Sequence, residues 1–214
     1  MGSSGRIFTL LAISAVFFSS PGLAQHLSGA VGMVNAGYSS THYLNAAGET
    51  ENADSIHVRS GYTLLGVEGY YRHERAIIAL SGNIGTQEAH KRGNKFLEPF
   101  IWSTHASFGW LLSHKTNVCI YPAVGLGVSR LTITEHNQYT DTHDEVMRIT
   151  KPTADVSFHC DYLIVDPRPD GKIVNGIALG AKIGYDFSVV SPARLHGWYC
   201  TISVGGLAFM RRDK

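Results

Sequence analysis

The chain has 214 residues, of which 44% are hydrophobic and only 16% charged, against about 25% charged in a typical soluble domain. Lysine and arginine number 18, aspartate and glutamate 17. This balance excludes the clustered basic excess that nucleic-acid binding requires. No run of about 18 apolar residues occurs, so the sequence predicts no transmembrane helix. The absence of such a run does not exclude a membrane β-barrel, which spreads its apolar surface over alternate residues.

The first 24 residues have the pattern of an export signal. Arg6 supplies a positive charge, residues 7–18 form an apolar run, and residues 22–24 (Gly-Leu-Ala) form a small-x-small cleavage site. We therefore expect a cleaved signal peptide at 1–24, followed by a single domain at 25–214.

The clearest alternating pattern runs from Phe100 to Val128. Bulky apolar side chains occupy one face of an extended strand at 100–112, and small or polar ones occupy the other. A polar break at 113–117 reverses the chain, and the return strand repeats the pattern. Strands of about 11–13 residues exceed the ~5–6 usual in soluble sheets. They match the ~9–11 that a tilted strand needs to cross a bilayer.

Six other segments alternate in the same way. The eight expected strands, in chain order, are residues 27–38, 61–71, 76–85, 100–112, 117–134, 150–165, 177–187 and 198–209. Short links alternate with longer polar loops, which we place at 39–60, 87–98 and 135–148. Short turns at one end and long loops at the other are typical of outer-membrane barrels. The sequence predicts an all-β fold, a single eight-stranded antiparallel up-and-down transmembrane β-barrel with its long loops outside the cell.

The polar faces of these strands predict what fills the barrel. Eight strands enclose a lumen that side chains just fill, without a continuous water channel. We expect a structural network of inward-facing ionisable groups, namely Glu68, His105, Asp155, His159, Asp161, Lys182 and Asp186. If the turn at 166–172 centres between Arg168 and Pro169, Asp155 and Lys182 lie directly opposite each other and form an ion pair. We favour a plug of this kind over a proton or ion path.

Amphipathic aromatic rings near the strand ends predict where the headgroups lie. Such rings prefer the boundary between hydrocarbon and water. The expected aromatic girdle consists of Tyr71, Trp110, Tyr162 and Trp198.

With these features the chain resembles the small eight-stranded outer-membrane proteins of the OmpX and OmpA barrel type, a broad porin-like β-barrel group. The similarity covers residues 25–210 and includes segments such as 65–71 (LGVEGYY) and 121–127 (YPAVGLG). It implies a monomer in the bacterial outer membrane, in contact with membrane lipids and lipopolysaccharide and inserted by the barrel-assembly machinery. Such barrels commonly end on an aromatic residue, whereas this chain continues beyond Phe209 to Lys214.

For function we expect a structural or surface-interaction role through the loops at 39–60, 87–98 and 135–148, without an open pore. One alternative is a lipid-modifying enzyme, which needs a serine, a histidine and an acid near the outer rim. The candidate pair Ser157 and His159 is expected to face inward, so we predict no catalytic residue. The other alternative is a soluble lipocalin-like carrier of apolar ligands, which would extract without detergent.

The loop at 135–148 is rich in possible metal ligands. It contains Glu135, His136, Asp141, His143, Asp144 and Glu145. Their spacing matches no zinc pattern and lacks the glycine of a calcium-binding EF-hand. We therefore predict a solvated loop, no metal site and no cofactor, and leave cation binding by this loop open. The three cysteines at 119, 160 and 200 lack metal-binding spacing and read as small hydrophobic residues.

Overall fold

The computed structural model describes residues 27–44, 61–92, 95–113, 117–137, 142–165, 173–189 and 194–211. The predicted signal peptide at 1–24 and most of the stretch at 39–60 lie outside the described residues. Within these ranges, none of the structure is a helix that is long and apolar enough to cross a membrane.

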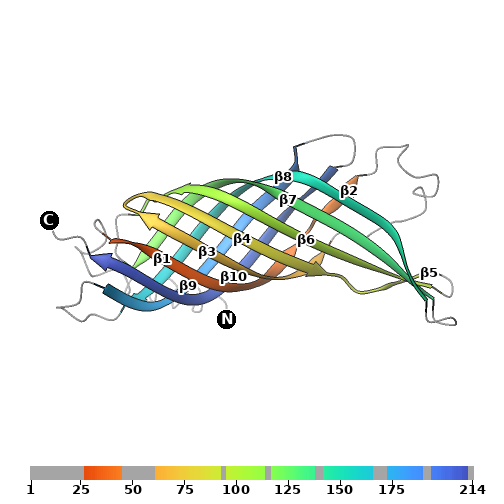
Figure 1. Ribbon diagram of the computed structural model, residues 1–214, viewed down its shortest axis with the longest axis horizontal. Coiled ribbons are helices and arrows are strands. Elements are labelled where there is room, and N and C mark those ends of the chain that lie inside the picture. The colour runs from red at the N-terminus through yellow and green to blue at the C-terminus, as the bar shows by residue number, and fades with distance from the viewer. Residues whose placement is uncertain are drawn as a thin grey trace, which may run out of the picture.

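The described strands form one closed antiparallel sheet (Figure 1). In chain order they are β1 (Leu27–Ser39), β2 (His42–Leu44), β3 (Tyr62–His73), β4 (Ala76–Thr86), β5 (His90–Arg92), β6 (Lys95–Trp110), β7 (Val118–Asn137), β8 (Thr142–Val165), β9 (Ile173–Ser188) and β10 (Arg194–Arg211). The last strand pairs with the first from Leu27↔Arg211 to Ser39↔Tyr199, which closes the barrel. β2 and β5 are short additions to β10 and β6. The predicted all-β, eight-stranded up-and-down barrel is confirmed.

The connection between β3 and β4 is tighter than predicted. The two strands stay paired as far as His73↔Ala76, so Glu74 and Arg75 alone make the turn. Glu74 has a φ of 55°, as a two-residue hairpin that follows the strand twist requires. The strands expected at 61–71 and 76–85 left a four-residue link, and that prediction is wrong because the structure shortens the link to two residues. Arg72 belongs to β3, and its side chain lies inside the barrel with 1% exposure.

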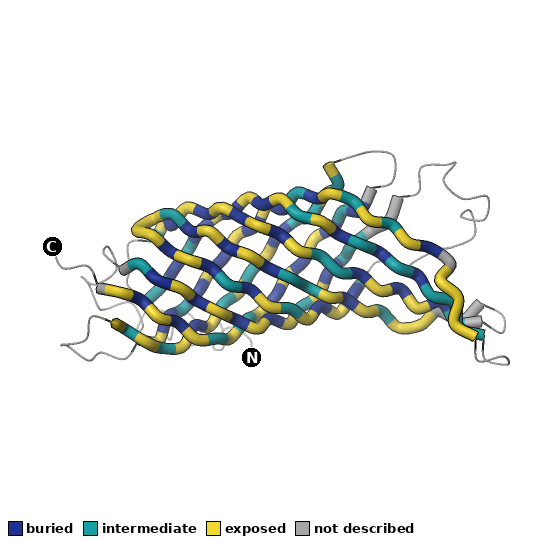
Figure 2. The backbone as a smooth tube through the Cα atoms, viewed as in Figure 1, coloured by how far each residue is buried: buried dark blue, intermediate teal, exposed yellow. Residues whose placement is uncertain are grey.

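Burial alternates along every long strand (Figure 2). Bulky apolar side chains point outward, as Leu126 does with 68% exposure. Phe108 and Trp110 on β6 also point outward, while Ile101 and His105 of the same strand are buried. A band of exposed leucine, isoleucine, valine and aromatic side chains is unfavourable in water and suits contact with lipid. The architecture is that of an outer-membrane-type barrel, with alternate residues facing lipid and lumen.

Three strands continue beyond the rest of the barrel at the loop end. β6, β7 and β8 have 16, 20 and 24 residues, and they run out together toward β5 (Figure 1). Pairing reaches Lys95↔Asn137 between β6 and β7 and Asn137↔Thr142 between β7 and β8. We call residues 95–100, 130–137 and 142–151 the protruding sheet.

The loops expected at 87–98 and 135–148 are therefore largely β structure, and that prediction was wrong. The outer face of the protruding sheet carries mainly polar side chains, such as Arg130 and Thr134, because lipid does not cover it, while buried apolar residues such as Leu131 and Ile133 occupy most of its inner face. The apolar alternation that marked the membrane strands is consequently weak there. A register shift between Ile133 and Thr134 also interrupts the period of two.

The lumen contains three layers rather than the small and charged filling that the sequence suggested. A hydrophobic cluster at the turn end includes Tyr70, Ile77, Tyr121, Leu163 and Phe209. A second, at the loop end, includes Tyr62, Leu64, Leu131, Ile133, Met147 and Tyr199. Most of the buried polar residues lie between these clusters, whereas Arg72 lies beside the first one. The ring of Phe209 is fully buried in the first cluster, and β10 continues past it to Arg211.

Candidate functional site

The seven ionisable residues expected in the lumen come from four strands and gather in the middle layer. Glu68 lies on β3 and His105 on β6; Asp155, His159 and Asp161 lie on β8; Lys182 and Asp186 lie on β9. All point inward, because they occupy the positions that alternate with the lipid-facing residues. Their role as a stabilising network remains a prediction.

Glu68 is the centre of one group of contacts. Its Oε2 atom lies 3.3 Å from Lys182 Nζ, and its Oε1 atom lies 3.4 Å from His159 Nδ1. β3 lies across the lumen from β8 and β9, so these contacts join opposite walls of the barrel. The imidazole of His159 also stacks on the Tyr121 ring, with centroids 4.4 Å apart.

The expected pairing of Asp155 with Lys182 is wrong by four residues. Asp155 lies opposite Asp186, and Lys182 lies opposite His159. The observed register centres two residues later in the sequence than we assumed, on Asp-Gly at 170–171, outside the described residues. The prediction was centred on Arg168 and Pro169, although Asp-Gly two residues later is the stronger hairpin signal in the sequence. The two charges do share the lumen face, but Lys182 reaches Glu68 instead.

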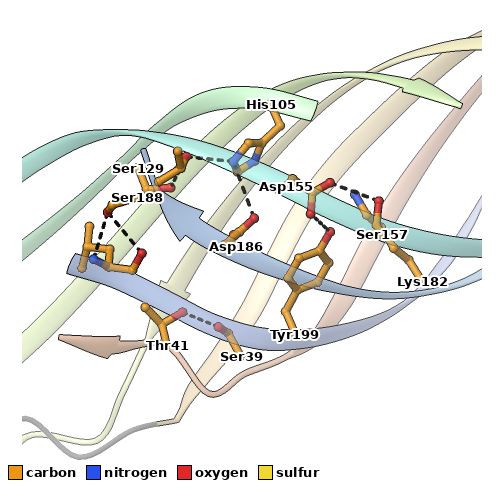
Figure 3. Close-up of polar contacts among 12 residues, drawn as sticks. Ser39, Thr41, His105, Ser129, Asp155, Ser157, Lys182, Asp186, Ser188 and Tyr199 are labelled. Atoms are coloured by element: carbon orange, nitrogen blue, oxygen red, sulfur yellow. Dashed lines mark hydrogen bonds and ion pairs between the residues drawn. The ribbon is translucent and has the colours of Figure 1, made fainter. Parts of the chain in front are cut away.

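A second group of contacts surrounds Asp155 (Figure 3). The Tyr199 hydroxyl donates to Asp155 Oδ1 at 2.5 Å, and the Ser157 hydroxyl donates to Oδ2 at 3.1 Å. Gly184 on β9 lies opposite Tyr199 on β10. A Cβ atom on Gly184 would collide with the tyrosine ring. Glycine at this position therefore makes room for the ring to lie across the lumen.

His105 and Asp161 lie on either side of this group. The Nε2 atom of His105 is 2.9 Å from Thr153 Oγ1 and 3.6 Å from Asp186 Oδ1. Asp161 accepts a hydrogen bond of 3.4 Å from the Tyr121 hydroxyl. Tyr121 and Tyr199 were not among the predicted network residues. The signal that could have found them is their place on the inward faces of β7 and β10, where a phenol needs a polar partner.

Arg72 is a further charged lumen residue that the sequence analysis missed. It donates from Nε to the carbonyl of Glu74 at 3.0 Å and from Nη1 to Cys119 Sγ at 3.4 Å. Extending the alternation of β3 by one residue would have placed its side chain inside.

Ser157, His159 and Glu68 have the connectivity of a catalytic triad. Ser157 Oγ lies 3.1 Å from His159 Nε2, and the other ring nitrogen faces Glu68. However, Ser157 and His159 are only 4% and 2% exposed. A nearby cavity, lined in part by Lys182 and Tyr199, has a volume of about 20 Å³, enough for about one water molecule. The serine and the histidine are therefore enclosed by the packing of the lumen rather than open to the surface.

The aromatic residues lie near both ends of the lipid-facing band. Of the four predicted girdle residues, Tyr71, Trp110 and Tyr162 lie toward the turn end and Trp198 toward the loop end. Tyr71, Trp110 and Trp198 are exposed, and Tyr162 is partly buried. At the loop end the structure adds outward-facing residues that the prediction omitted, namely Tyr38, Trp102 and Tyr185.

The polar residues expected in the loop at 135–148 lie mainly on β7 and β8. Register places Glu135 opposite Asp144 and His136 opposite His143. Glu145 forms an ion pair with Arg148, three residues further along β8. Asp141 lies outside the described residues.

No family model matches the chain. No curated protein matches it either. Among solved structures, Ail, the attachment invasion locus protein of Yersinia pestis, is 10% identical over 87% of this chain and 99% of its own, with a TM-score of 0.45. Neisserial surface protein A is 12% identical over 86% and 97%, with a TM-score of 0.44. The N-terminal β-barrel domain of Pseudomonas aeruginosa OprF is 13% identical over 82% and 98%, with a TM-score of 0.34.

At these identities and TM-scores the similarities carry no argument about function. The resemblance to small outer-membrane barrels is confirmed at the level of the fold by the closed eight-stranded pairing.

Proposed function

We propose that this protein is a bacterial outer-membrane barrel that holds a β-sheet above the membrane as a surface for contacts outside the cell. The observation that carries this proposal is the protruding sheet, in which β7 and β8 stay paired to Asn137↔Thr142. Pairing between β8 and β9 begins only at Thr153↔Ser188.

The outer-membrane location follows from the barrel surface. A soluble lipocalin-like carrier buries its apolar face and exposes its charged one, and this barrel has the reverse arrangement. Closed barrels satisfy all of their backbone hydrogen bonds within the wall, as the bilayer interior requires. Exposed aromatic rings toward both ends of the apolar band, such as Trp110 and Trp198, fit the two headgroup regions.

One edge of the protruding sheet is available to a partner. In the described part of the chain, residues 143–151 of β8 pair with β7 alone. An open strand edge presents backbone donors and acceptors to which an extended peptide can add. Charged side chains along this edge, including Asp144, Arg148 and Lys151, oppose indiscriminate pairing and favour a partner with complementary charges.

The membrane partner that fits the outer face is an anionic lipid headgroup, lipopolysaccharide included. Arg130 lies on the outer face of β7 near the loop end, with its guanidinium carbon 5.3 Å from the centroid of the Trp102 ring. Its Nε donates to Thr150 Oγ1 at 2.9 Å. These contacts orient the guanidinium group beside an interfacial aromatic residue, where it can meet lipid phosphate.

The lumen supports neither a pore nor lipid-modifying catalysis in this proposal. Contacts between Glu68 and Lys182 cross the polar layer, and hydrophobic clusters fill the layers on both sides. The serine and histidine that could serve an enzyme lie within this packing. A single chain is enough to close the barrel, since its own β1 and β10 pair with each other and complete the wall.

Deleting residues 134–145 tests the surface role. The shortened chain should still insert, extract only with detergent and migrate anomalously on unboiled gels, because the membrane part of the wall is unchanged. Intact cells carrying the full chain should bind a panel of immobilised host-matrix proteins more strongly than cells carrying the deletion. Equal binding of both strains would contradict the surface role, and extraction of the full chain without detergent would contradict the membrane location.

A further inference from the structure

The outer face of the protruding sheet brings two histidines together. His136 on β7 lies directly opposite His143 on β8. Their rings are stacked, with centroids 4.2 Å apart and planes within 7° of each other. They are seven residues apart in sequence, a spacing that belongs to no metal motif, and only the hairpin register makes them neighbours.

Two carboxylates lie on the same face, one row closer to the membrane. Glu98 on β6 and Glu145 on β8 both lie opposite Thr134. Side chains two residues apart on one strand share a face, and diagonal neighbours across a strand pair are about 7–8 Å apart. The carboxylates are therefore within side-chain reach of the histidine pair. Glu145 and His143 are both exposed.

We propose that His136 and His143 form a binding site for a divalent transition-metal ion, with Glu145 as a third ligand. Imidazole nitrogen is a preferred ligand of Zn²⁺, Cu²⁺ and Ni²⁺. With Zn–N bonds of about 2.0–2.1 Å, tetrahedral geometry needs nitrogens about 3.4 Å apart. The two rings lie in nearly parallel planes, so both imidazoles must rotate out of the stack before their in-plane nitrogen lone pairs can point at one ion.

As the side chains stand, no three His, Cys, Asp or Glu residues of the described part of the chain are placed to hold a metal ion, so Glu145 can join the site only by leaving its present partner. Its carboxylate now pairs with Arg148, and the side chains of both residues are exposed, 38% for Glu145 and 56% for Arg148. An exposed pair of this kind contributes little free energy, so a metal ion can displace the arginine. Water would complete the coordination. The bound ion would link β7 to β8 near the tip of the protruding sheet.

The test uses the full mature chain folded in detergent micelles and titrated with Zn²⁺ by calorimetry. We expect one ion per chain in the wild type. His136→Phe and His143→Phe keep a stacked ring pair but remove a ligand, and each should weaken binding at least about tenfold. Glu145→Gln should weaken it less. His73→Ala, at the opposite end of the barrel, should leave binding unchanged.

The ring signals of wild-type His136 and His143 in an NMR titration provide a measurement that needs no variant. Both should shift with Zn²⁺, because the ion binds at the ring nitrogens. Equal Zn²⁺ affinity in the wild type and both phenylalanine variants would overturn the proposal. Unmoved ring signals would overturn it as well. Neither measurement depends on whether the protruding sheet contacts a partner.

Discussion

The barrel wall and the protruding sheet are built from the same strands in opposite surroundings. On β7, Leu126 faces lipid and Gly127 faces the lumen, whereas eight to ten residues further along both faces of the strand carry polar groups. Inside the barrel, ionisable side chains are held against each other and away from solvent. On the protruding sheet the same residue types are exposed. We therefore expect the buried polar groups of this protein to be structural and any binding chemistry to lie above the membrane.

The largest expected effect comes from breaking the ion pair that crosses the lumen. Glu68→Ala leaves Lys182 without its carboxylate partner inside the barrel. Loss of one member of a buried pair costs about 3–5 kcal/mol in the free energy of unfolding, measured by urea titration in lipid vesicles. Glu145→Ala breaks the exposed pair with Arg148 and should cost about 0–1 kcal/mol. Equal losses in the two variants would contradict the distinction between the two regions.

The same charge placed at two points along the outer face of β7 should have very different effects. Leu126→Arg puts an arginine against the hydrocarbon, which costs about 2–4 kcal/mol near the bilayer midplane. Thr134→Arg places it beside Glu98 and Glu145 on the protruding sheet, where we expect a change within about 0.5 kcal/mol. The measurement is again the free energy of unfolding in vesicles. If Leu126→Arg is as stable as Thr134→Arg, the outer face does not contact lipid.

A smaller effect is expected from removing one lumen hydroxyl. Tyr199→Phe takes away the hydrogen bond to Asp155 Oδ1 and leaves a buried acceptor unpaired, at a cost of about 1–3 kcal/mol. Tyr38→Phe removes a hydroxyl from an exposed tyrosine on the outer face and should change stability by less than about 0.5 kcal/mol. Comparing the unfolding curves of the two variants tests whether the lumen-facing hydroxyl contributes more stability than the outward-facing one. A Tyr199→Phe curve that overlays the wild type would show that Asp155 does not depend on this bond.

The smallest effect is expected at the boundary between the two regions. Arg130→Ala loses a guanidinium–indole contact worth about 0.5–1 kcal/mol at an exposed site. Arg130→Lys keeps the charge and loses the planar fork that binds phosphate in a bidentate manner. Both variants should lose more stability in vesicles containing lipopolysaccharide than in phosphatidylcholine vesicles. The same loss in both lipids would show that Arg130 acts only through Trp102 and Thr150.

Strand alternation in the sequence determined the barrel, the strand count and the face on which each residue of the membrane wall lies. These follow from the period of two in side-chain direction, which is a local property of the chain. It placed His105, Asp155 and Lys182 inside and Leu126 outside without any knowledge of their partners. It failed above the membrane, where lipid no longer forces one face to be apolar, and so strands were read as loops.

Only the tertiary structure decided which residues meet. Contacts such as Glu68 with Lys182 join strands that are not neighbours in the wall, and barrel closure alone brings them together. The facing of His136 and His143 depends on the hairpin register, and a shift of a few residues there separates them. The face to which each side chain points is determined locally, by its position in the strand, whereas register and barrel closure depend on the whole sheet.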